Sequence, residues 1–86
     1  MDWCVYILEC ADGSLYTGIT NDLDRRLQEH RAGKGAKYTK GRGPLNLVYW
    51  EVCQDRGLAS KRENQIKRLG RQAKLSLVAT IYPSSN

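Results

Sequence analysis

Two basic side chains lie on the apolar stripe of one predicted helix. Leu23 and Leu27 define the stripe that turns toward the rest of the protein. Arg26 and His30 each follow one of these leucines by three residues, a spacing that places them on the same helix face. Burying an arginine is costly unless a partner compensates it, so Arg26 is a candidate for binding an anionic ligand. The alternatives are that Arg26 pairs with Asp22 one turn earlier and that His30 is only a polar helix-end residue.

An acidic residue occupies a similar position in a later helix. Glu63 lies four residues after Ala59 and three before Ile66, on the stripe that these apolar residues mark. A carboxylate that faces inward needs a compensating charge, which a divalent cation supplies. A pair with Lys67 one turn later is the alternative and needs no metal. The pattern leaves both interpretations open.

The segment 31–43 is basic, rich in glycine and free of acidic residues. Glycine lets backbone N–H groups approach a phosphate chain, basic side chains neutralise it, and a tyrosine ring stacks on a base. The segment lacks the Gly-x-x-x-x-Gly-Lys-[Ser/Thr] pattern of nucleotide hydrolysis. A flexible, solvated loop is the alternative interpretation. The nucleic-acid-binding residues that we predict are Arg31, Lys34, Lys37, Tyr38, Lys40 and Arg42.

Positive charge is concentrated after residue 30. The 86 residues carry a net charge of +5, but residues 1–30 hold only two basic residues against six acidic ones. Residues 31–86 hold twelve basic residues against three acidic ones. A polarised basic half suits a polyanion such as DNA, although charge alone is equally consistent with a role in solubility.

Cysteine and hydropathy patterns exclude several classes of protein. Cys4, Cys10 and Cys53 form no Cys-x-x-Cys pair, and the chain has one histidine, so neither a zinc site nor a disulfide framework is expected. Free thiols suit a reducing cytoplasm, which is the location that we expect. The longest apolar run, residues 3–8, is too short to span a membrane and resembles no signal peptide, so we expect no membrane partner.

The predicted elements form one α+β domain in the order β-β-α-β-α-α. Residues 3–10 are rich in β-branched and aromatic types, which favours a strand covered on both faces, and Asp12-Gly13 is a hairpin turn signal. We expect a small three-stranded antiparallel sheet flanked by helices, within a single domain of residues 1–82 and a tail of residues 83–86. The expected elements are strands 3–10, 15–20 and 45–53, a helix from Asn21 or Asp22 to Gly33, a helix from Asp55 to Leu69, and a helix over 71–82.

Several short motifs in this chain occur in a characteristic order. They are Val5-Tyr6-Ile7, then Leu15-Tyr16-Thr17-Gly18, then the helix segment 22–30 with Arg26 and His30, and then Arg62-Glu63-Asn64. Together they resemble the GIY-YIG nuclease superfamily over residues 3 to about 70, and most closely its short stand-alone bacterial branch. The stretch 35–44 followed by Leu-Val-Tyr also resembles the nuclease domain of the eukaryotic structure-selective junction endonuclease.

The resemblance implies a metal-dependent endonuclease that hydrolyses phosphodiester bonds in DNA, including branched or damaged forms handled in repair. Tyr6 and Tyr16 take the two tyrosine positions of the family, and Arg26 takes the position of its catalytic arginine. Glu63 takes the position of the family's single carboxylate ligand for Mg²⁺ or Mn²⁺. His30 matches a histidine found in part of the family.

The implied mechanism gives these residues distinct roles. Tyr6 would help to deprotonate the attacking water, which requires nearby positive charge to lower its pKa from about 10. Arg26 would stabilise charge on the phosphate and the metal ion would stabilise the leaving oxygen. Two alternatives remain: a non-catalytic nucleic-acid-binding module that keeps the fold, and an interaction domain that needs a protein partner.

The hairpin register decides whether the two tyrosines share a site. A two-residue turn at Asp12-Gly13 would place Tyr6 and Tyr16 on opposite faces of the sheet, because side chains alternate along each strand. For a shared site we therefore predict an odd-length loop or a bulge near Gly18.

Overall fold

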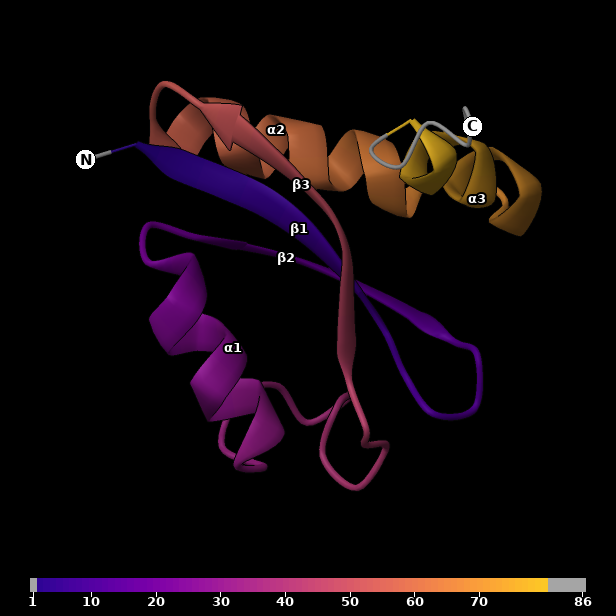
Figure 1. The fold of residues 1–86 in the computed structure, drawn as a ribbon. Helices are drawn as coiled ribbons and strands as arrows, with labels where there is room; N and C mark the ends of the chain where they lie inside the picture. The colour runs from indigo at the N-terminus through magenta and orange to yellow at the C-terminus, as the bar shows by residue number, and fades with distance from the viewer. Residues whose placement is uncertain (1, 81–86) are drawn as a thin grey trace.

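The computed structural model describes residues 2–80 and confirms the predicted α+β fold and element order (Figure 1). The predicted tail, together with Tyr82 of the predicted last helix, lies outside the described residues. The elements are β1 (Trp3–Glu9), β2 (Leu15–Thr20), α1 (Leu23–Arg31), β3 (Asn46–Cys53), α2 (Arg56–Lys67) and α3 (Arg71–Ala79).

The sheet has the strand order β2-β1-β3 and is covered by helices on both faces. In Figure 1, α1 and the segment that follows it lie on one side of the sheet, and α2 and α3 lie on the other. Residues 4–8 of the central strand are all buried, as expected for a strand covered on both faces. Alternate residues enter different cores: Tyr6 and Leu8 pack with Leu27 of α1, whereas Val5 and Ile7 belong to the core that contains α2.

The β1–β2 hairpin has an odd-length loop, as a shared tyrosine site requires. Cys10 N–H donates to the Ser14 carbonyl, so three residues form the tip, and Gly13 takes the left-handed φ of +84° that this type of loop demands. Tyr6 therefore pairs with Gly18 and Leu8 with Tyr16, which places both tyrosines on one face. The alternative that we predicted, a bulge near Gly18, is absent from the β1–β2 register, and the irregularity lies between β1 and β3 instead.

Aspartate caps fix the starts of the first two helices. The Asp22 side chain accepts from Arg25 N–H at 3.2 Å, and the Asp55 side chain accepts from Leu58 N–H at 2.8 Å. Of the two cap residues predicted for α1, the structure selects Asp22. Because its carboxylate serves the helix backbone, it contributes to the start of α1 rather than to charge pairing along the helix.

The tip of the hairpin joins two distant parts of the chain. Ala11 N–H donates to the Arg42 carbonyl at 2.8 Å, and Arg42 forms an ion pair with Asp12 at 2.7 Å, so the basic segment is held against the hairpin. The Arg71 side chain at the start of α3 donates to the Gly13 carbonyl at 3.1 Å. These contacts hold the segment between α1 and β3 over the face that carries the tyrosines.

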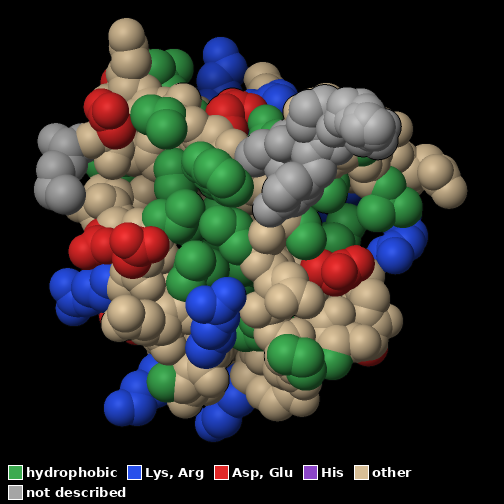
Figure 2. Space-filling view, in the orientation of Figure 1, with side chains coloured by type: hydrophobic (Ala, Val, Ile, Leu, Met, Phe, Trp, Pro, Cys, Tyr) green, Lys and Arg blue, Asp and Glu red, His purple; other side chains and the backbone are tan. Residues whose placement is uncertain are grey.

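One part of the sheet has no helical cover. Trp50 and Val52 of the edge strand β3 lie opposite Tyr6 and Cys4, on the α1 side, and both are exposed. Figure 2 shows hydrophobic side chains gathered on the face of the molecule turned toward the viewer. Within residues 2–80, no helix combines the length and apolar character needed to cross a membrane.

The packing predicts that one conservative substitution increases stability. Thr17 is buried, and its Oγ1 lacks a hydrogen-bond partner among the described residues. Thr17→Val removes this unpaired polar atom at nearly constant shape, so the free energy of unfolding in urea should rise by about 1 kcal/mol. Thr20→Val is the matched control, because Thr20 Oγ1 accepts from Asp22 N–H at 3.0 Å. The control should lose stability, and a loss in both variants would contradict the prediction.

Candidate active site

A hydrogen bond joins β1 to α1 beneath the surface of the site. Tyr6 Oη lies 2.8 Å from His30 Nε2, and both side chains are almost completely buried. The helix pattern that placed His30 on the inner face of α1 is confirmed by this burial. The hairpin supplies the phenol and the helix supplies the imidazole.

The second nitrogen of His30 determines the direction of this hydrogen bond. Nδ1 lies 2.8 Å from Thr39 Oγ1, and the Thr39 hydroxyl donates to the Ala36 carbonyl at 3.0 Å. A hydroxyl has one hydrogen, so Thr39 must accept from Nδ1–H, which leaves Nε2 as the acceptor of the Tyr6 proton. The network is thus an oriented chain from Tyr6 through His30 and Thr39 to a backbone carbonyl.

Aromatic rings surround His30. The Tyr16 ring centroid lies 5.2 Å from that of His30 and 6.3 Å from that of Tyr6. Tyr38 extends the group, with its centroid 5.8 Å from Tyr16 and the Arg42 guanidinium 4.5 Å above its ring. The edge-to-face contacts fix the orientation of the imidazole, and the exposed Tyr38 continues the aromatic group to the surface.

Arg26 lies beside the tyrosine–histidine pair and is partly open to solvent. Its side chain is 31 % exposed and forms an ion pair with Glu29 at 3.0 Å. The alternative partner considered from the sequence, Asp22, caps the helix instead. The neighbouring Arg25 side chain is 76 % exposed and lies 3.5 Å from the other carboxylate oxygen of Glu29. The arginine on the inner stripe is therefore the one positioned at the site.

The electrostatics overturn one expectation about Tyr6. Burial raises the pKa of Tyr6 to about 12, and the Arg26 guanidinium opposes this shift without cancelling it. The expectation that positive charge lowers this pKa was therefore wrong, because loss of solvent outweighs the charge. Burial, followed by the charge of Arg26, lowers the pKa of His30, so the imidazole is neutral near pH 7. The pair thus consists of a neutral phenol and a neutral imidazole that accepts its proton.

Two glycines provide the space that this pair occupies. A Cβ on Gly18 would lie 2.6 Å from Tyr6 Oη and 2.8 Å from Tyr6 Cζ. A Cβ on Gly35 would lie within 3 Å of three atoms of the His30 ring. Any side chain at either position would displace one member of the hydrogen bond.

Glu63 is not brought into this cluster. Its carboxylate is 17 % exposed and lies 3.2 Å from Lys67 Nζ, the pairing that the sequence left open. It belongs to α2, which covers the opposite face of the sheet and packs along the edge strand β2 that carries Tyr16. No hydrogen bond or ion pair among residues 2–80 joins Glu63 to the tyrosines, Arg26 or His30.

The donor chemistry of Glu63 fits a hard cation only as a single protein ligand. Carboxylate oxygens are the donors that Mg²⁺ and Mn²⁺ prefer, and Mg²⁺ commonly keeps several waters beside one or two carboxylates. Residues 2–80 contain no group of three acidic, histidine or cysteine ligands. The metal-binding role of Glu63 therefore stays a prediction.

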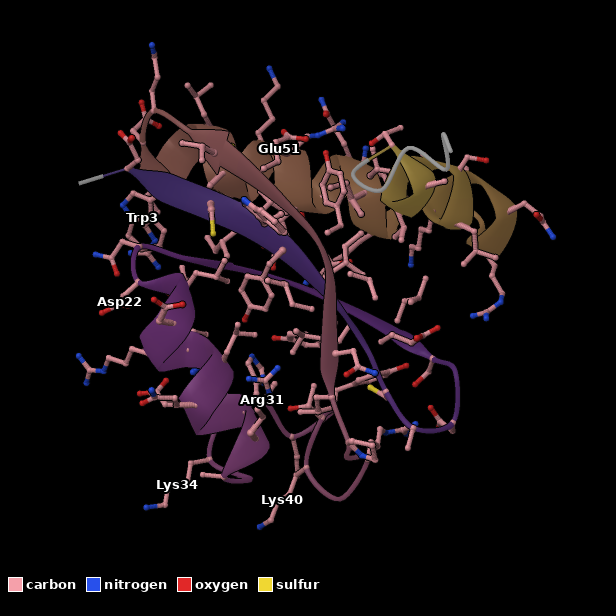
Figure 3. All side chains as sticks on the ribbon, viewed as in Figure 1. Trp3, Asp22, Arg31, Lys34, Lys40 and Glu51 are labelled. Atoms are coloured by element: carbon pink, nitrogen blue, oxygen red, sulfur yellow. The ribbon has the colours of Figure 1, made fainter. Side chains whose placement is uncertain are left out.

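The predicted nucleic-acid-binding residues lie between the end of α1 and the start of β3, but their charged groups are not equally available to a ligand. Lys34 and Lys40 project from the segment after α1, away from the sheet, whereas Arg31 turns back toward β3 (Figure 3). Arg42 is neutralised by Asp12, thirty residues earlier, a partner that no local pattern reveals. Thr39 was also missed as a partner of His30, because a single hydroxyl in a glycine-rich segment carries no periodic signal.

Comparisons with known proteins place this geometry in a family. The sequence profile described as the GIY-YIG catalytic domain matches residues 2–76. The chain belongs to the GIY-YIG family. This is an endonuclease superfamily, and a nuclease family implies a nucleic-acid substrate. The resemblance stated from the motifs is thereby confirmed.

Relatives within the GIY-YIG family are small proteins of similar length. The chain is 56 % identical to a UPF0213 protein of Desulfotalea psychrophila over 88 % of this chain and 70 % of the relative. It is similar in solution structure to a UPF0213 protein from Bacillus halodurans, with 50 % identity, a TM-score of 0.61, and coverage of 93 % of this chain and 85 % of that one. A protein from E. faecalis has 35 % identity and a TM-score of 0.63, with coverage of 95 % and 88 %.

The close contact at Gly18 predicts a large effect of one methyl group. Gly18→Ala should lower the free energy of unfolding by about 1–3 kcal/mol, because the new Cβ overlaps the Tyr6 phenol and forces it to move. Gly43→Ala is the matched control, since a Cβ there meets no atom within 4 Å. Equal stability of the two variants in urea unfolding would contradict this account of the glycine.

The neutral His30 predicts a specific dependence of stability on pH. The pKa of His30 lies below 6.5 in the folded protein but near 6.5 in the unfolded chain. Below about pH 6.5 the unfolded state binds a proton that the folded state does not, so the free energy of unfolding should fall as the pH drops from about 7.5 to about 5. Urea unfolding across this interval should show a steeper fall for the wild type than for His30→Gln, and parallel profiles would exclude His30 as the cause.

Proposed function

We propose that this protein is a metal-dependent endonuclease that hydrolyses phosphodiester bonds in DNA. The observation that carries the proposal is the partly exposed Arg26 guanidinium beside the buried Tyr6–His30 pair. This arrangement combines a phosphate-binding cation with a route for a proton, which are two requirements of phosphodiester hydrolysis. Membership of a nuclease family supports the same reaction.

Arg26 binds the phosphate that is cut. Its contact with Glu29 lies at the surface, where an ion pair contributes only about 0–1 kcal/mol, so a phosphate competes readily for the guanidinium. The neighbouring phenol and the contact with Glu29 raise the pKa of Arg26, which keeps it charged. Two N–H groups on one planar guanidinium match two phosphate oxygens.

Tyr6 and His30 move the proton of the attacking water. With a pKa of about 12, Tyr6 does not ionise on its own near pH 7. Its oxygen takes the water proton while its own proton passes to His30 Nε2, which already accepts that hydrogen. His30 becomes an imidazolium, and its Nδ1–H remains bonded to Thr39.

Glu63 is the residue that we assign to the metal, and Tyr16 forms a wall of the site. Glu63 would hold a Mg²⁺ or Mn²⁺ ion through its carboxylate, and the bound ion would supply positive charge for the leaving oxygen. Tyr16 is half-buried and fixes the imidazole through its edge contact with His30. The proposed mechanism therefore keeps four catalytic residues, with His30 as the proton acceptor. They are Tyr6, Tyr16, Arg26 and His30.

The segment after α1 binds the DNA backbone beside the site. Arg31, Lys34, Lys37 and Lys40 are exposed, and ionic contacts of this kind weaken as salt rises. Tyr38 is 42 % exposed, with Arg42 stacked on its ring, so an unstacked base can pack against this pair. Branched or damaged DNA, in which bases are unpaired, suits such a surface.

The second candidate function is a nucleic-acid-binding module without catalysis, either alone or with a protein partner. It is favoured by the ion pair between Glu63 and Lys67, which compensates the carboxylate without a metal ion. On this alternative, DNA binding depends on salt, survives Glu63→Gln, and is accompanied by no cutting. A partner-dependent protein would cut only in the complex.

The decisive prediction concerns two adjacent arginines. Purified protein is incubated with plasmid, flap, fork and junction DNA in Mg²⁺, in Mn²⁺ and in EDTA. Arg26→Ala should reduce the cutting rate by about 10²–10³-fold, the typical effect of removing one group that stabilises transition-state charge. Arg25→Ala, which removes the same charge from the exposed side of α1, should change the rate by less than about threefold.

A second pair of measurements tests the metal. Glu63→Gln should abolish cutting in either metal while DNA affinity in EDTA is retained. A wild-type protein that binds DNA but cuts none of these substrates in either metal would favour the binding module instead. Equal losses in Arg26→Ala and Arg25→Ala would show that general charge, and not the site, accounts for the effect.

A further inference from the structure

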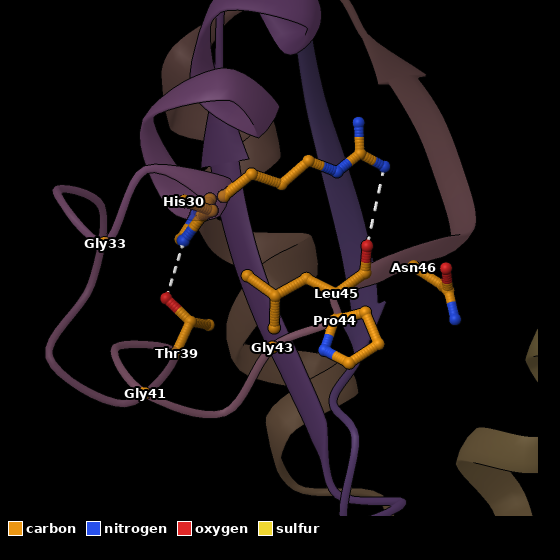
Figure 4. A pocket seen from close by; sticks show the side chains of 9 residues that line it. His30, Gly33, Thr39, Gly41, Gly43, Pro44, Leu45 and Asn46 are labelled. Atoms are coloured by element: carbon orange, nitrogen blue, oxygen red, sulfur yellow. Dashed lines mark hydrogen bonds between the residues drawn. The ribbon is translucent and has the colours of Figure 1, made fainter.

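A cavity of about 360 Å³ lies beside His30 and Thr39 (Figure 4). It is formed where the end of α1, the glycine-rich segment and the start of β3 meet. Its volume lies at the lower end of the range for pockets that bind small organic ligands. The residues that line it are His30, Arg31, Gly33, Thr39, Gly41, Gly43, Pro44, Leu45 and Asn46.

Three glycines contribute to the lining of this cavity. Gly33 and Gly41 have φ values of +76° and +78°, a conformation that other residues rarely adopt. A Cβ added to any of the three lining glycines would meet no atom within 4 Å. The space is therefore bounded by backbone on one side, where N–H and C=O groups are close to any occupant.

The lining has the chemistry of a nucleotide site. None of its residues is acidic, and the Arg31 guanidinium makes only a long 3.5 Å hydrogen bond to the Leu45 carbonyl, so it is available to an anion. Asn46 is exposed and carries both a donor and an acceptor, which suits the polar edge of a base. Pro44 and Leu45 supply an apolar surface for the face of a planar ring.

His30 forms a wall shared by the cavity and the proposed catalytic pair. Its Nε2 accepts from Tyr6, and its ring also lines the cavity together with Thr39. An occupant of the cavity would therefore lie next to the group that takes the proton. A nucleotide adjacent to the cut phosphate is close enough along a strand to fill such a position.

We propose that this cavity holds one unpaired nucleotide of the strand that is cut, with its phosphate on Arg31 and its base edge on Asn46. The inference that this nucleotide belongs to the cut strand rests on the proposed nuclease function. The inference that the occupant is a nucleotide rests only on the residues that line the cavity. The cavity has the size of a site for one small organic ligand, so a nucleotide of a duplex would have to leave its base pair to enter it. The pocket then selects DNA that already contains an unpaired nucleotide, because less unstacking energy is spent.

A titration tests the chemistry of the pocket without any catalysis. Two-dimensional NMR spectra are recorded in EDTA with 2′-deoxyadenosine 5′-monophosphate as the probe. Backbone amide shifts should concentrate at Gly41, Gly43 and Asn46, and Gly43→Leu, which fills the cavity, should abolish them. Ser76→Leu places the same bulk on the exposed face of α3 and should bind like the wild type. Asn46→Leu, at an exposed position where folding is not at risk, should weaken binding, and shifts that lie elsewhere would overturn the proposal.

A second experiment distinguishes binding of a nucleotide within a DNA strand from binding of a free nucleotide. Affinity in EDTA is measured for a paired duplex, a duplex with one unpaired nucleotide, and the same duplex with an abasic residue at that position. The unpaired nucleotide should tighten binding about tenfold over both others, consistent with stacking of one base, and Gly43→Leu should remove this difference. Equal affinities for the base-containing and abasic duplexes would overturn the proposal. If the cavity binds a nucleotide as expected but the protein cuts no DNA, the proposed nuclease function is refuted and the proposed nucleotide site is not.

Discussion

The buried hydrogen bond between Tyr6 and His30 is the interaction on which the rest of the site depends. It joins the central strand of the sheet to α1, and every other feature of this face either makes room for it or holds it in place. Gly18 and Gly35 leave the space, Thr39 fixes the tautomer, and the Tyr16 ring packs against the imidazole. A fully buried pair of polar groups is tolerated because each finds a partner.

The site is assembled from short pieces that contribute little individually. The hairpin loop sets the face to which the tyrosines belong, an aspartate cap starts α1 where His30 can reach the sheet, and the hairpin tip holds the glycine-rich segment over both. These contacts are backbone hydrogen bonds and exposed ion pairs, each worth roughly 1 kcal/mol or less. In a domain of 86 residues, the positions of the site side chains therefore depend on many weak contacts that favour the same arrangement.

Local pattern predicted the elements well because helix stripes, caps and strand composition act over a few residues. The inward positions of His30 and Arg26 followed from helix periodicity, whereas the odd hairpin loop followed from strand alternation only once the resemblance had placed both tyrosines in one site. The sequence could not reveal contacts between residues that lie far apart along the chain. The pairing of Arg42 with Asp12 spans thirty residues, and the raised pKa of Tyr6 depends on how completely other segments bury it. The packing of α2 against β1 and β2, which positions Glu63, is likewise not specified by its own stripe.

The hydrogen-bond chain through His30 ends at the Ala36 carbonyl, and a carbonyl oxygen of a peptide has no proton to give and very little basicity with which to keep one. The chain is therefore closed at its inner end. Along this chain of hydrogen bonds, a proton that reaches the imidazole can return only through the Tyr6 oxygen. On the proposed mechanism, recovery of the neutral histidine along this chain therefore waits until the product has left the position beside the Tyr6 oxygen.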